Sequence, residues 1–256
     1  MIRRDPLRVA VLASWRADGL DGLFDRDGSS EVVAGVVTEP GSSAASLLDR
    51  HRVPWMLRDL RGFCLRRRVP LSDLGARRTF DAQTAAWLQT FRPDLVVLCG
   101  YRYLLAEPLL TSWADRVINV HDGDLRLRGP DGAPRYPGLR AVRDAICGGK
   151  PETRCTVHVV TPEIDAGPPL VVSGPYPVCL PAYVRGNGEG IGTYIALHRE
   201  RMIRDCWGPL LRTAVSLFCE DRVRVSGDAC AFIDGCPTPL VLSTGTACQS
   251  SVLEVS

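Results

Sequence analysis

Two polar side chains close an apolar run near the middle of the chain. Asn119 and His121 end the segment RVINVH (116–121), and a spacing of two residues places both side chains on the same face of a strand. Asp165 lies in the loop TPEIDAGP, just past another apolar run. An amide can donate to a developing oxyanion, a histidine can take a proton from an attacking amine, and a carboxylate can stabilise the resulting imidazolium. Together, these residues predict a site for attack on a carbonyl group.

The elements that must position these side chains follow from the spacing of apolar residues. Short apolar runs rich in β-branched residues predict strands, and helical patterns separate most of them. The predicted strands of the first half are 7–14, 31–38, 53–57, 94–100 and 116–121, with helices at 17–24, 42–50, 79–91, after Glu107 and at 138–147. Continuous apolar strands that alternate with helices are typical of a parallel sheet covered on both faces. Ligands bind such sheets outside the carboxyl ends of the strands.

The second half of the chain adds a loop and two more strands. Residues 122–135 are polar and rich in Gly and Pro, which predicts an exposed loop. The segments TRCTVHVVT (153–161) and PPLVVS (168–173) predict strands. The glycine cluster at 186–192 lacks the register of a nucleotide-binding loop and is interpreted as a flexible hinge.

A C-terminal extension follows this hinge. A long amphipathic pattern predicts a helix from Thr193 to about residue 218, bent where proline follows Gly208. The segment RVRVSGDACAFIDG predicts a small β-hairpin that turns near Gly227. We therefore expect an α/β domain over residues 1–185, with a helix-and-hairpin extension over residues 186–256 packed on it.

The composition excludes several classes of protein. The 256 residues carry 31 basic and 29 acidic side chains, and this near-neutral balance argues against nucleic acid as a partner. No run of about 18 apolar residues is long enough to span a membrane. The N-terminal residues show no signal-peptide pattern, so we expect a cytoplasmic protein. The ten cysteines form no C-x-x-C pair and no zinc-type spacing, so we expect no metal site.

Several motifs, in their order along the chain, resemble those of the folate-dependent formyltransferases. They are PDLVVLCGYRYLL (93–105), VINVHDGDL (117–125), RYPGLRAVRDAI (135–146) and TVHVVTPEIDAGPPLV (156–171). They are most similar to the glycinamide ribonucleotide transformylase branch, through N-x-H at a strand end, Y-P-G opening a helix and V-H-x-V-T before an aspartate-glycine turn. The resemblance implies a Rossmann-like, mostly parallel sheet. It also implies a one-carbon transferase that uses 10-formyltetrahydrofolate as co-substrate and no metal.

The resemblance also implies roles for individual residues. Asn119 would polarise the formyl oxygen, His121 would manage the proton of the tetrahedral intermediate, and Asp165 would orient His121 or relay the proton. The folate would lie against Tyr101, Arg102, Tyr103, Leu104, Leu105, Val160, Thr161, Ile164 and Gly167. The acceptor would contact the turn after the first strand and the Y-P-G motif, that is, Ser14, Trp15, Arg16, Tyr136, Pro137 and Gly138.

The acceptor side departs from the family pattern. In glycinamide ribonucleotide transformylases a glycine-rich turn after the first strand cradles the ribosyl phosphate, whereas this chain has no glycine between residue 14 and Gly19. A bulky Trp15 prevents backbone amides from closing on a phosphate. The family glutamate on the C-terminal helix falls at Arg204 or Ile203, with Glu200 nearby. We therefore expect formyl transfer to a small-molecule amine other than glycinamide ribonucleotide, such as a secondary metabolite or a modified amino acid.

Two other functions stay open from the sequence. Water in place of the amine would make the protein a 10-formyltetrahydrofolate hydrolase. A relative without chemistry would only bind folate or another metabolite, although binding alone would not require Asn119, His121 and Asp165 together. His158 is interpreted as a hydrogen-bonded structural histidine, and it cannot pair with Cys155 as base and nucleophile because the two face opposite sides of their strand. The oligomeric state, including a homodimer, is also left open.

Overall fold

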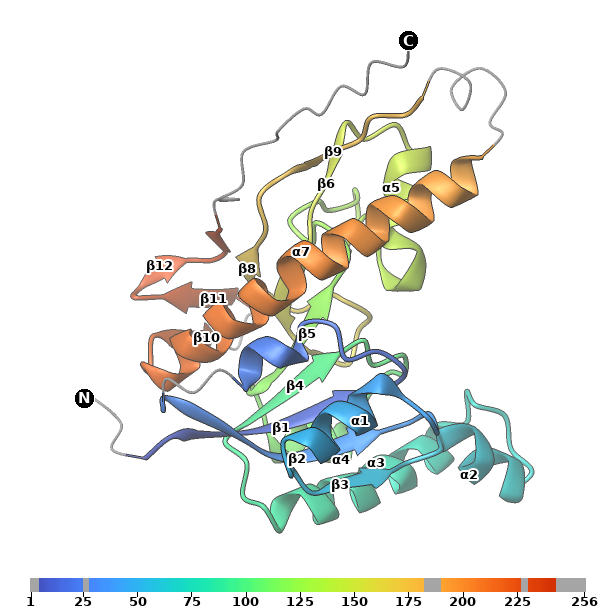
Figure 1. Cartoon of the computed structure of the whole chain (residues 1–256), viewed down its shortest axis with the longest axis vertical. Helices are drawn as coiled ribbons and strands as arrows, with labels where there is room; N and C mark the ends of the chain where they lie inside the picture. The colour runs from blue at the N-terminus through green and yellow to red at the C-terminus, as the bar shows by residue number, and fades with distance from the viewer. Residues whose placement is uncertain (1–4, 25–27, 182–189, 227–229, 243–256) are drawn as a thin grey trace.

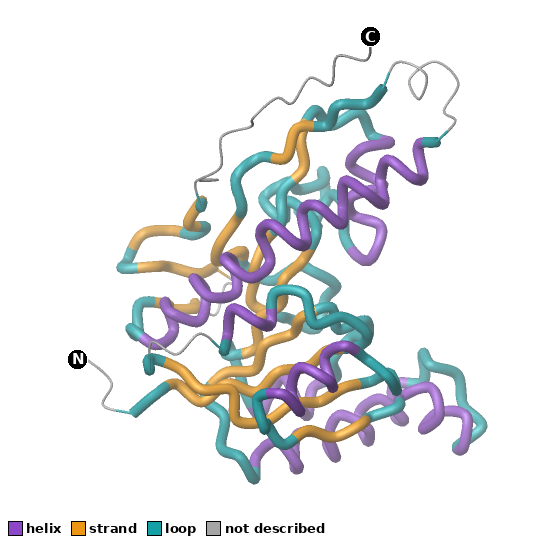
Figure 2. Tube along the Cα trace, viewed as in Figure 1, coloured by secondary structure: helices purple, strands orange, loops and turns teal. Residues whose placement is uncertain are grey.

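The computed structural model describes residues 5–24, 28–181, 190–226 and 230–242, and an eight-stranded sheet runs through its centre (Figure 1 and Figure 2). The strand order is β13-β8-β7-β5-β4-β1-β2-β3. The strands are β1 (Leu7–Ala13), β2 (Ser30–Val37), β3 (Trp55–Leu57), β4 (Leu95–Cys99), β5 (Val117–His121), β7 (Thr156–Val159), β8 (Pro169–Val172) and β13 (Leu240–Val241). Neighbouring strands are parallel except where β7 meets β5 and β8. Only β7 therefore runs against the others, and the predicted mostly parallel sheet is confirmed.

Helices cover both faces of this sheet, as predicted. They are η1 (Leu20–Leu23), α1 (Ser43–Arg50), α2 (Leu60–Arg66), α3 (Leu74–Gln89), α4 (Glu107–Ser112), η2 (Gly138–Arg140), α5 (Ala141–Cys147) and α7 (Ile191–Cys219). In β1, Val9 and Val11 join a core cluster with side chains of α1, α5 and α7, whereas Ala10 and Leu12 join a cluster with side chains of α3 and α4. The central strands are thus buried on both faces, which explains their continuous apolar sequences.

Aspartate caps begin two helices that the apolar pattern locates only in part. Asp59 accepts a hydrogen bond from the backbone N–H of Gly62 at 2.8 Å, and Asp73 accepts one from Ala76 at 2.7 Å. The apolar pattern does not predict α2 and predicts α3 only from residue 79, because the arginine-rich stretch 61–78 dilutes the pattern of both helices. The capping aspartates are the sequence signal that could have located them.

Two predicted segments are wrong. The helix expected over residues 17–24 is only the short turn η1, because Gly19 precedes it with a left-handed φ of 84° and no side-chain cap. The loop 122–135 is not exposed throughout, since Asp122 at its start is buried. Two side chains of α7 bind the carboxylate of Asp122 and hold the start of the loop against that helix.

The C-terminal segment packs onto the sheet (Figure 1). Helix α7 continues through Pro209 and buries Met202 and Leu210 in the cluster that contains side chains of β1 and β5. The predicted hairpin consists of β10 (Val223–Ser226) and β11 (Cys230–Ile233), joined by β12 (Cys236–Pro237), and β6 (Glu152–Thr153) pairs with β9 (Tyr176–Pro177). Most of the expected hinge (182–189), the hairpin turn with Gly227, and the tail from residue 243 lie outside the described residues.

No helix in the described ranges combines the length and the apolar character needed to cross a membrane.

Candidate active site

A cavity of about 610 Å³ lies where β1, β4 and β5 end. It is lined by the residues that follow β1 and β4, by the end of β5, by the loop after β7 and by two side chains of α7. Because β1 pairs with β2 on one side and β4 on the other, the connections from β1 and β4 leave the sheet at its topological switch point. Ligand sites of α/β sheets occur at this position, and the volume suits a small-molecule ligand.

The pairing of β5 with β7 brings two polar side chains face to face. Asn119 and His158 are directly opposite in the antiparallel register, and Asn119 Nδ2 lies 3.1 Å from His158 Nε2. His158 Nδ1 lies 2.9 Å from the carbonyl oxygen of Val159. Because a carbonyl only accepts, Nδ1 carries the ring proton and Nε2 accepts a hydrogen bond from the Asn119 amide. One amide hydrogen of Asn119 is therefore fixed on His158, and the orientation of the whole amide is fixed with it.

Asp165 lies beside both histidines. Its Oδ2 is 3.6 Å from His121 Nδ1 and its Oδ1 is 3.7 Å from His158 Nε2. These separations exceed a hydrogen bond, but they allow a strong charge interaction when the imidazole of His121 is protonated. The backbone N–H of Gly138 donates to Asp165 Oδ2 at 2.6 Å, and Asp165 itself adopts a left-handed φ of 52°. The carboxylate is thus held in place from the Y-P-G motif.

His121 keeps its second ring nitrogen buried. Its side chain is only 9% exposed, and Nε2 has no hydrogen-bond partner in the part of the chain that the structure describes. Gly123 leaves room for this ring, because a Cβ there would lie 2.9 Å from Nε2. Buried polar atoms without partners are rare, and a catalytic role is one of the few explanations for them.

Burial decides the charge state of His158. Loss of solvent, followed by the neighbouring His121, lowers the pKa of this imidazole to about 4, although Asp165 opposes the shift. His158 is therefore neutral near pH 7 and remains a hydrogen-bond acceptor for Asn119. The four side chains of Asn119, His121, His158 and Asp165 can together stabilise an oxyanion and move one proton.

Most of the site residues predicted from the sequence line this cavity. Besides Asn119, His121 and Asp165, they are Trp15, Arg16, Tyr101, Arg102, Tyr103, Leu104, Leu105, Gly138, Val160, Thr161 and Ile164. His158 lines it as well, so its interpretation as a structural histidine describes its hydrogen bonds but misses its place in the site. Among the described residues, no three His, Cys, Asp or Glu side chains lie close enough together to hold a metal ion.

Four of the predicted contact residues, namely Ser14, Tyr136, Pro137 and Gly167, do not line the cavity. Ser14 is fully buried, where its Oγ accepts hydrogen bonds from Thr38 and from the N–H of Arg102. Of the Y-P-G motif, only Gly138 lines the cavity, and Tyr136 and Pro137 lie outside its lining. Gly167 packs against β7, because a Cβ there would lie 1.9 Å from the carbonyl oxygen of Val159.

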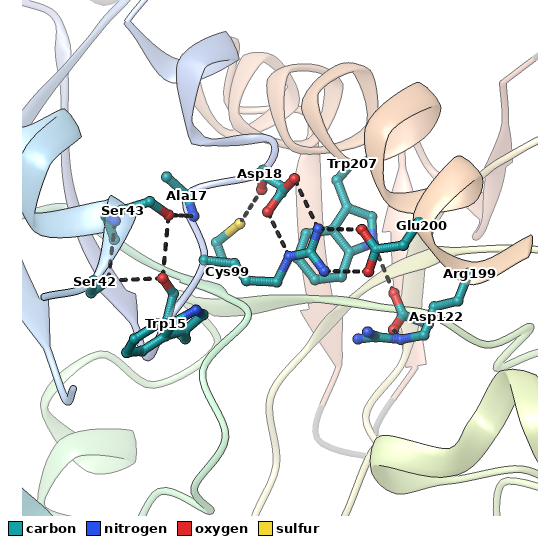
Figure 3. A network of polar contacts seen from close by, with 12 residues as sticks. Trp15, Ala17, Asp18, Ser42, Ser43, Cys99, Asp122, Arg199, Glu200 and Trp207 are labelled. Carbon is teal, nitrogen blue, oxygen red and sulfur yellow. Dashed lines mark hydrogen bonds and ion pairs between the residues drawn. The ribbon is translucent and has the colours of Figure 1, made fainter. Parts of the chain in front are cut away.

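An ionic network on the other wall was missed from the sequence. Asp122 Oδ2 accepts a hydrogen bond from Arg199 Nε at 2.5 Å, and Asp122 Oδ1 accepts one from Trp207 Nε1 at 2.9 Å (Figure 3). Arg199 and Trp207 are eight residues apart, about two helical turns, and so approach Asp122 from neighbouring positions of α7. The one sequence signal for this network is that Asp122 directly follows His121, a candidate catalytic residue.

A profile of the formyl transferase family matches residues 7–176, which is more than half of the chain. The protein belongs to the formyl transferase family. The chain is 31% identical over 176 residues to the phosphoribosylglycinamide formyltransferase of Mycobacterium tuberculosis (strain H37Rv), and the match covers 68% of this chain and 72% of that protein. The solved structure of glycinamide ribonucleotide transformylase 1 from Symbiobacterium toebii is similar with a TM-score of 0.73 at 26% identity, covering 90% of this chain and 95% of that one.

The chain also resembles part of a larger protein. It is 28% identical over 184 residues to the trifunctional purine biosynthetic protein adenosine-3 of Drosophila melanogaster. The match covers 70% of this chain but spans only 12% of the length of that protein. These similarities confirm the fold class and the family resemblance that the motifs indicated.

Proposed function

We propose that this formyl transferase moves the formyl group of 10-formyltetrahydrofolate to the amine of a small-molecule acceptor. The observation that carries the proposal is the convergence of Asn119, His121 and Asp165 on one cavity, where the buried Nε2 of His121 has no partner among the described residues. Family membership supports formyl chemistry, and the arrangement supplies a donor for an oxyanion, a proton carrier and a fixed carboxylate. A site that only bound folate would not require all three.

The residues divide the reaction between them. 10-Formyltetrahydrofolate would supply the formyl carbon: the acceptor nitrogen bonds to this carbon, its bond to N10 breaks, and the proton lost by the amine ends on N10, giving a formamide and tetrahydrofolate. Asn119 directs its second amide hydrogen at the formyl oxygen, where a preorganised donor contributes about 3–4 kcal/mol. His121 takes up the proton of the amine, and Asp165 stabilises the imidazolium until the proton is passed on.

One wall of the cavity suits the fused ring of a folate. Three apolar side chains of this wall also belong to, or pack against, the cluster between the sheet and helices α3 and α4. They are Leu98, Leu105 and Val160. Leu104 and Ile164 are 46% and 48% exposed at the same wall, although large apolar side chains gain by burial. A flat apolar ring that covered these side chains would remove them from water, which supports the folate side of the proposal.

The opposite wall departs from a phosphate cradle, because two backbone groups of the turn after β1 are bound within the protein. The carbonyl oxygen of Trp15 accepts hydrogen bonds from the hydroxyls of Ser42 and Ser43, and the N–H of Ala17 donates to Ser43 Oγ at 3.1 Å (Figure 3). A phosphate cradle needs free backbone N–H groups that converge on the anion. The N–H of Ala17 is already bound and cannot contribute to one.

Arg16 is also unavailable to a phosphate. Glu200 accepts two hydrogen bonds from its guanidinium at 2.5 and 2.6 Å, and Asp18 accepts two more at 2.6 and 3.1 Å. These carboxylates, Glu200 first, raise the pKa of Arg16 above its ordinary value. The arginine is therefore neutralised from two sides, which supports an acceptor other than glycinamide ribonucleotide.

The proposal is tested by following release of tetrahydrofolate from 10-formyltetrahydrofolate with and without a panel of amines. We expect release that depends on an amine, and we expect Asn119→Ala and His121→Ala to lower kcat by about 100-fold or more. Gln89→Ala, which removes an exposed amide on α3 outside the cavity, is the matched control and should keep the full rate. Unchanged rates in both site variants, or release that no amine accelerates, would contradict the proposal.

A further inference from the structure

The positive charges that line the cavity are not equally free to bind a ligand. Three arginines line it: Arg16, Arg102 and Arg199. Arg16 is bound by two carboxylates, and Arg199 is bound by Asp122. Within the described ranges, no carboxylate lies within ion-pairing distance of Arg102, which is exposed. Arg102 is thus the cation of this cavity that a ligand can pair with.

Hydrogen bonding and packing fix the backbone that carries Arg102. The N–H of Arg102 donates to the buried Ser14 Oγ at 3.0 Å, which ties the segment after β4 to the end of β1. Gly100, two residues earlier, lies against Arg16 and Trp207, since a Cβ there would meet atoms of both within 4 Å. The segment that carries Arg102 therefore lies against the β1 turn and α7, and Arg102 lines the cavity together with Trp15, Arg16 and Trp207.

Two carboxylates of the cavity lie on a different element from Arg102. Glu163 and Asp165 both line the cavity on the loop after β7, and β5 separates β7 from β4 in the sheet. The cavity is therefore polarised, with a free cation after β4 and carboxylates after β7. A ligand with an amine at one end and a carboxylate at the other would be aligned by these charges, with its amine toward His121 and Asp165.

Two exposed apolar side chains stand at the same cavity. Trp15 is 56% exposed and Leu139 is 65% exposed, and both line it. An indole offers a large flat surface for an aromatic or aliphatic group, and burying such area is favourable. This surface replaces the glycine-rich turn that a phosphate would need.

We propose that the acceptor is an amino carboxylate with an apolar or aromatic body, whose carboxylate binds Arg102 and whose body lies against Trp15. This inference rests on the proposed formyl transfer and names its substrate class. The amine becomes the formamide and the carboxylate takes no part in the reaction. The glutamate of the folate is the other source of a carboxylate, and the controls below distinguish it from the acceptor.

Matched pairs of amines test the inference. Each pair keeps the body and removes the carboxylate: L-phenylalanine with phenethylamine, and L-leucine with isopentylamine. We expect the amino acid of each pair to have the higher kcat/KM, by roughly 10–100-fold, because a charged hydrogen-bonded pair is lost with the carboxylate. Arg102→Met should abolish this preference by raising KM for the amino acid, and Trp15→Ala should reduce the preference for L-phenylalanine over L-alanine.

Controls separate the two sources of carboxylate. Arg201→Met removes an arginine that is 60% exposed on α7 and does not line the cavity, and it should change neither KM. KM for 10-formyltetrahydrofolate should stay the same in Arg102→Met. If KM for 10-formyltetrahydrofolate rises instead, and does not rise for an analogue whose glutamate is an uncharged amide, Arg102 binds the folate and the inference is overturned.

The failure of this inference differs from the failure of the proposed function. Formyl transfer with equal kcat/KM for both members of each pair would overturn the inference alone. No transfer to any amine would contradict the proposed function. In that case, calorimetric binding of L-phenylalanine but not phenethylamine, in the presence of tetrahydrofolate, would still support the carboxylate site, and equal or absent binding of both would overturn it.

Discussion

Replacing His158 with phenylalanine should slow formyl transfer although His158 reaches no reacting atom. In our account His158 is a positioning residue, because its Nε2 accepts the amide hydrogen of Asn119 at 3.1 Å. Phenylalanine keeps a ring of similar size at this buried position but offers no acceptor. The amide of Asn119 is then free to turn, and its second hydrogen no longer points at the formyl oxygen.

The expected magnitude follows from the contact that is lost. A buried hydrogen bond contributes about 0.5–1.5 kcal/mol net, and an orphaned polar partner costs about 1–3 kcal/mol. We therefore expect kcat to fall by roughly 10–100-fold, equivalent to about 1.4–2.7 kcal/mol. The effect should appear in kcat rather than in KM for the folate, because the Asn119 donor matters most in the transition state.

The assay compares steady-state kinetics of His158→Phe and His158→Gln with those of the unaltered protein. The amide oxygen of glutamine can accept the same hydrogen bond, so His158→Gln should recover part of kcat. His198→Phe is the matched control: it removes a histidine that bonds Thr153 at 2.7 Å and does not line the cavity, and it should leave kcat unchanged. Because burial lowers the pKa of His158 to about 4, the ratio of the rates of His158→Gln and the unaltered protein should stay constant from pH 6 to pH 9.

Three results would refute this reasoning. Equal kcat in His158→Phe and the unaltered protein would show that Asn119 needs no fixed partner. Equal loss in the Phe and Gln variants would show that the shape of the ring matters rather than its acceptor. A ratio that changes between pH 6 and pH 9 would show that His158 titrates in that range and is not the neutral acceptor described here.

Two further predictions concern stability. Burial raises the pKa of Asp81 to about 6. The stability linked to its protonated form is therefore present below about pH 4 and is lost as the pH rises through 6. At pH 8 the free energy of unfolding of Asp81→Asn should exceed that of the unaltered protein by up to about 3 kcal/mol. Urea unfolding at pH 4 and pH 8 checks this, and a difference that does not grow with pH would contradict it. Gly167→Ala should cost more than about 2 kcal/mol, because its Cβ would overlap the carbonyl oxygen of Val159, whereas Gly192→Ala has open space in α7 and should cost nothing. Equal melting temperatures of the two glycine variants would contradict the packing argument.

The parts of the site that were predicted from the sequence are those set by local geometry. Asn119 and His121 share a face because strands alternate with a period of two residues, and their place at a strand end follows from the apolar pattern. The partner of Asn119 could not be predicted in this way. His158 lies opposite Asn119 only because β5 and β7 pair in a particular register across 39 residues of chain.

The contacts of Ser14 and Asp122 could not be predicted for a similar reason. The sequence places Ser14 at the end of a strand but does not show that its hydroxyl turns inward to bond Thr38 and Arg102. The polar, Gly- and Pro-rich sequence predicts an exposed loop at Asp122. It does not show that the partners of this carboxylate, Arg199 and Trp207, lie on a helix 77 and 85 residues away. Contacts of this kind depend on how α7 packs across the sheet, which no local pattern encodes.

The most direct test of the central claim follows the formyl carbon itself. 10-Formyltetrahydrofolate labelled with ¹³C in the formyl group is incubated with the protein and an amine that supports release of tetrahydrofolate, and the label is located by NMR. We expect a ¹³C formamide on the amine, formed about 100-fold more slowly or not at all by Asn119→Ala. Label recovered as free formate, at the same rate with and without the amine, would contradict formyl transfer and assign the site to hydrolysis.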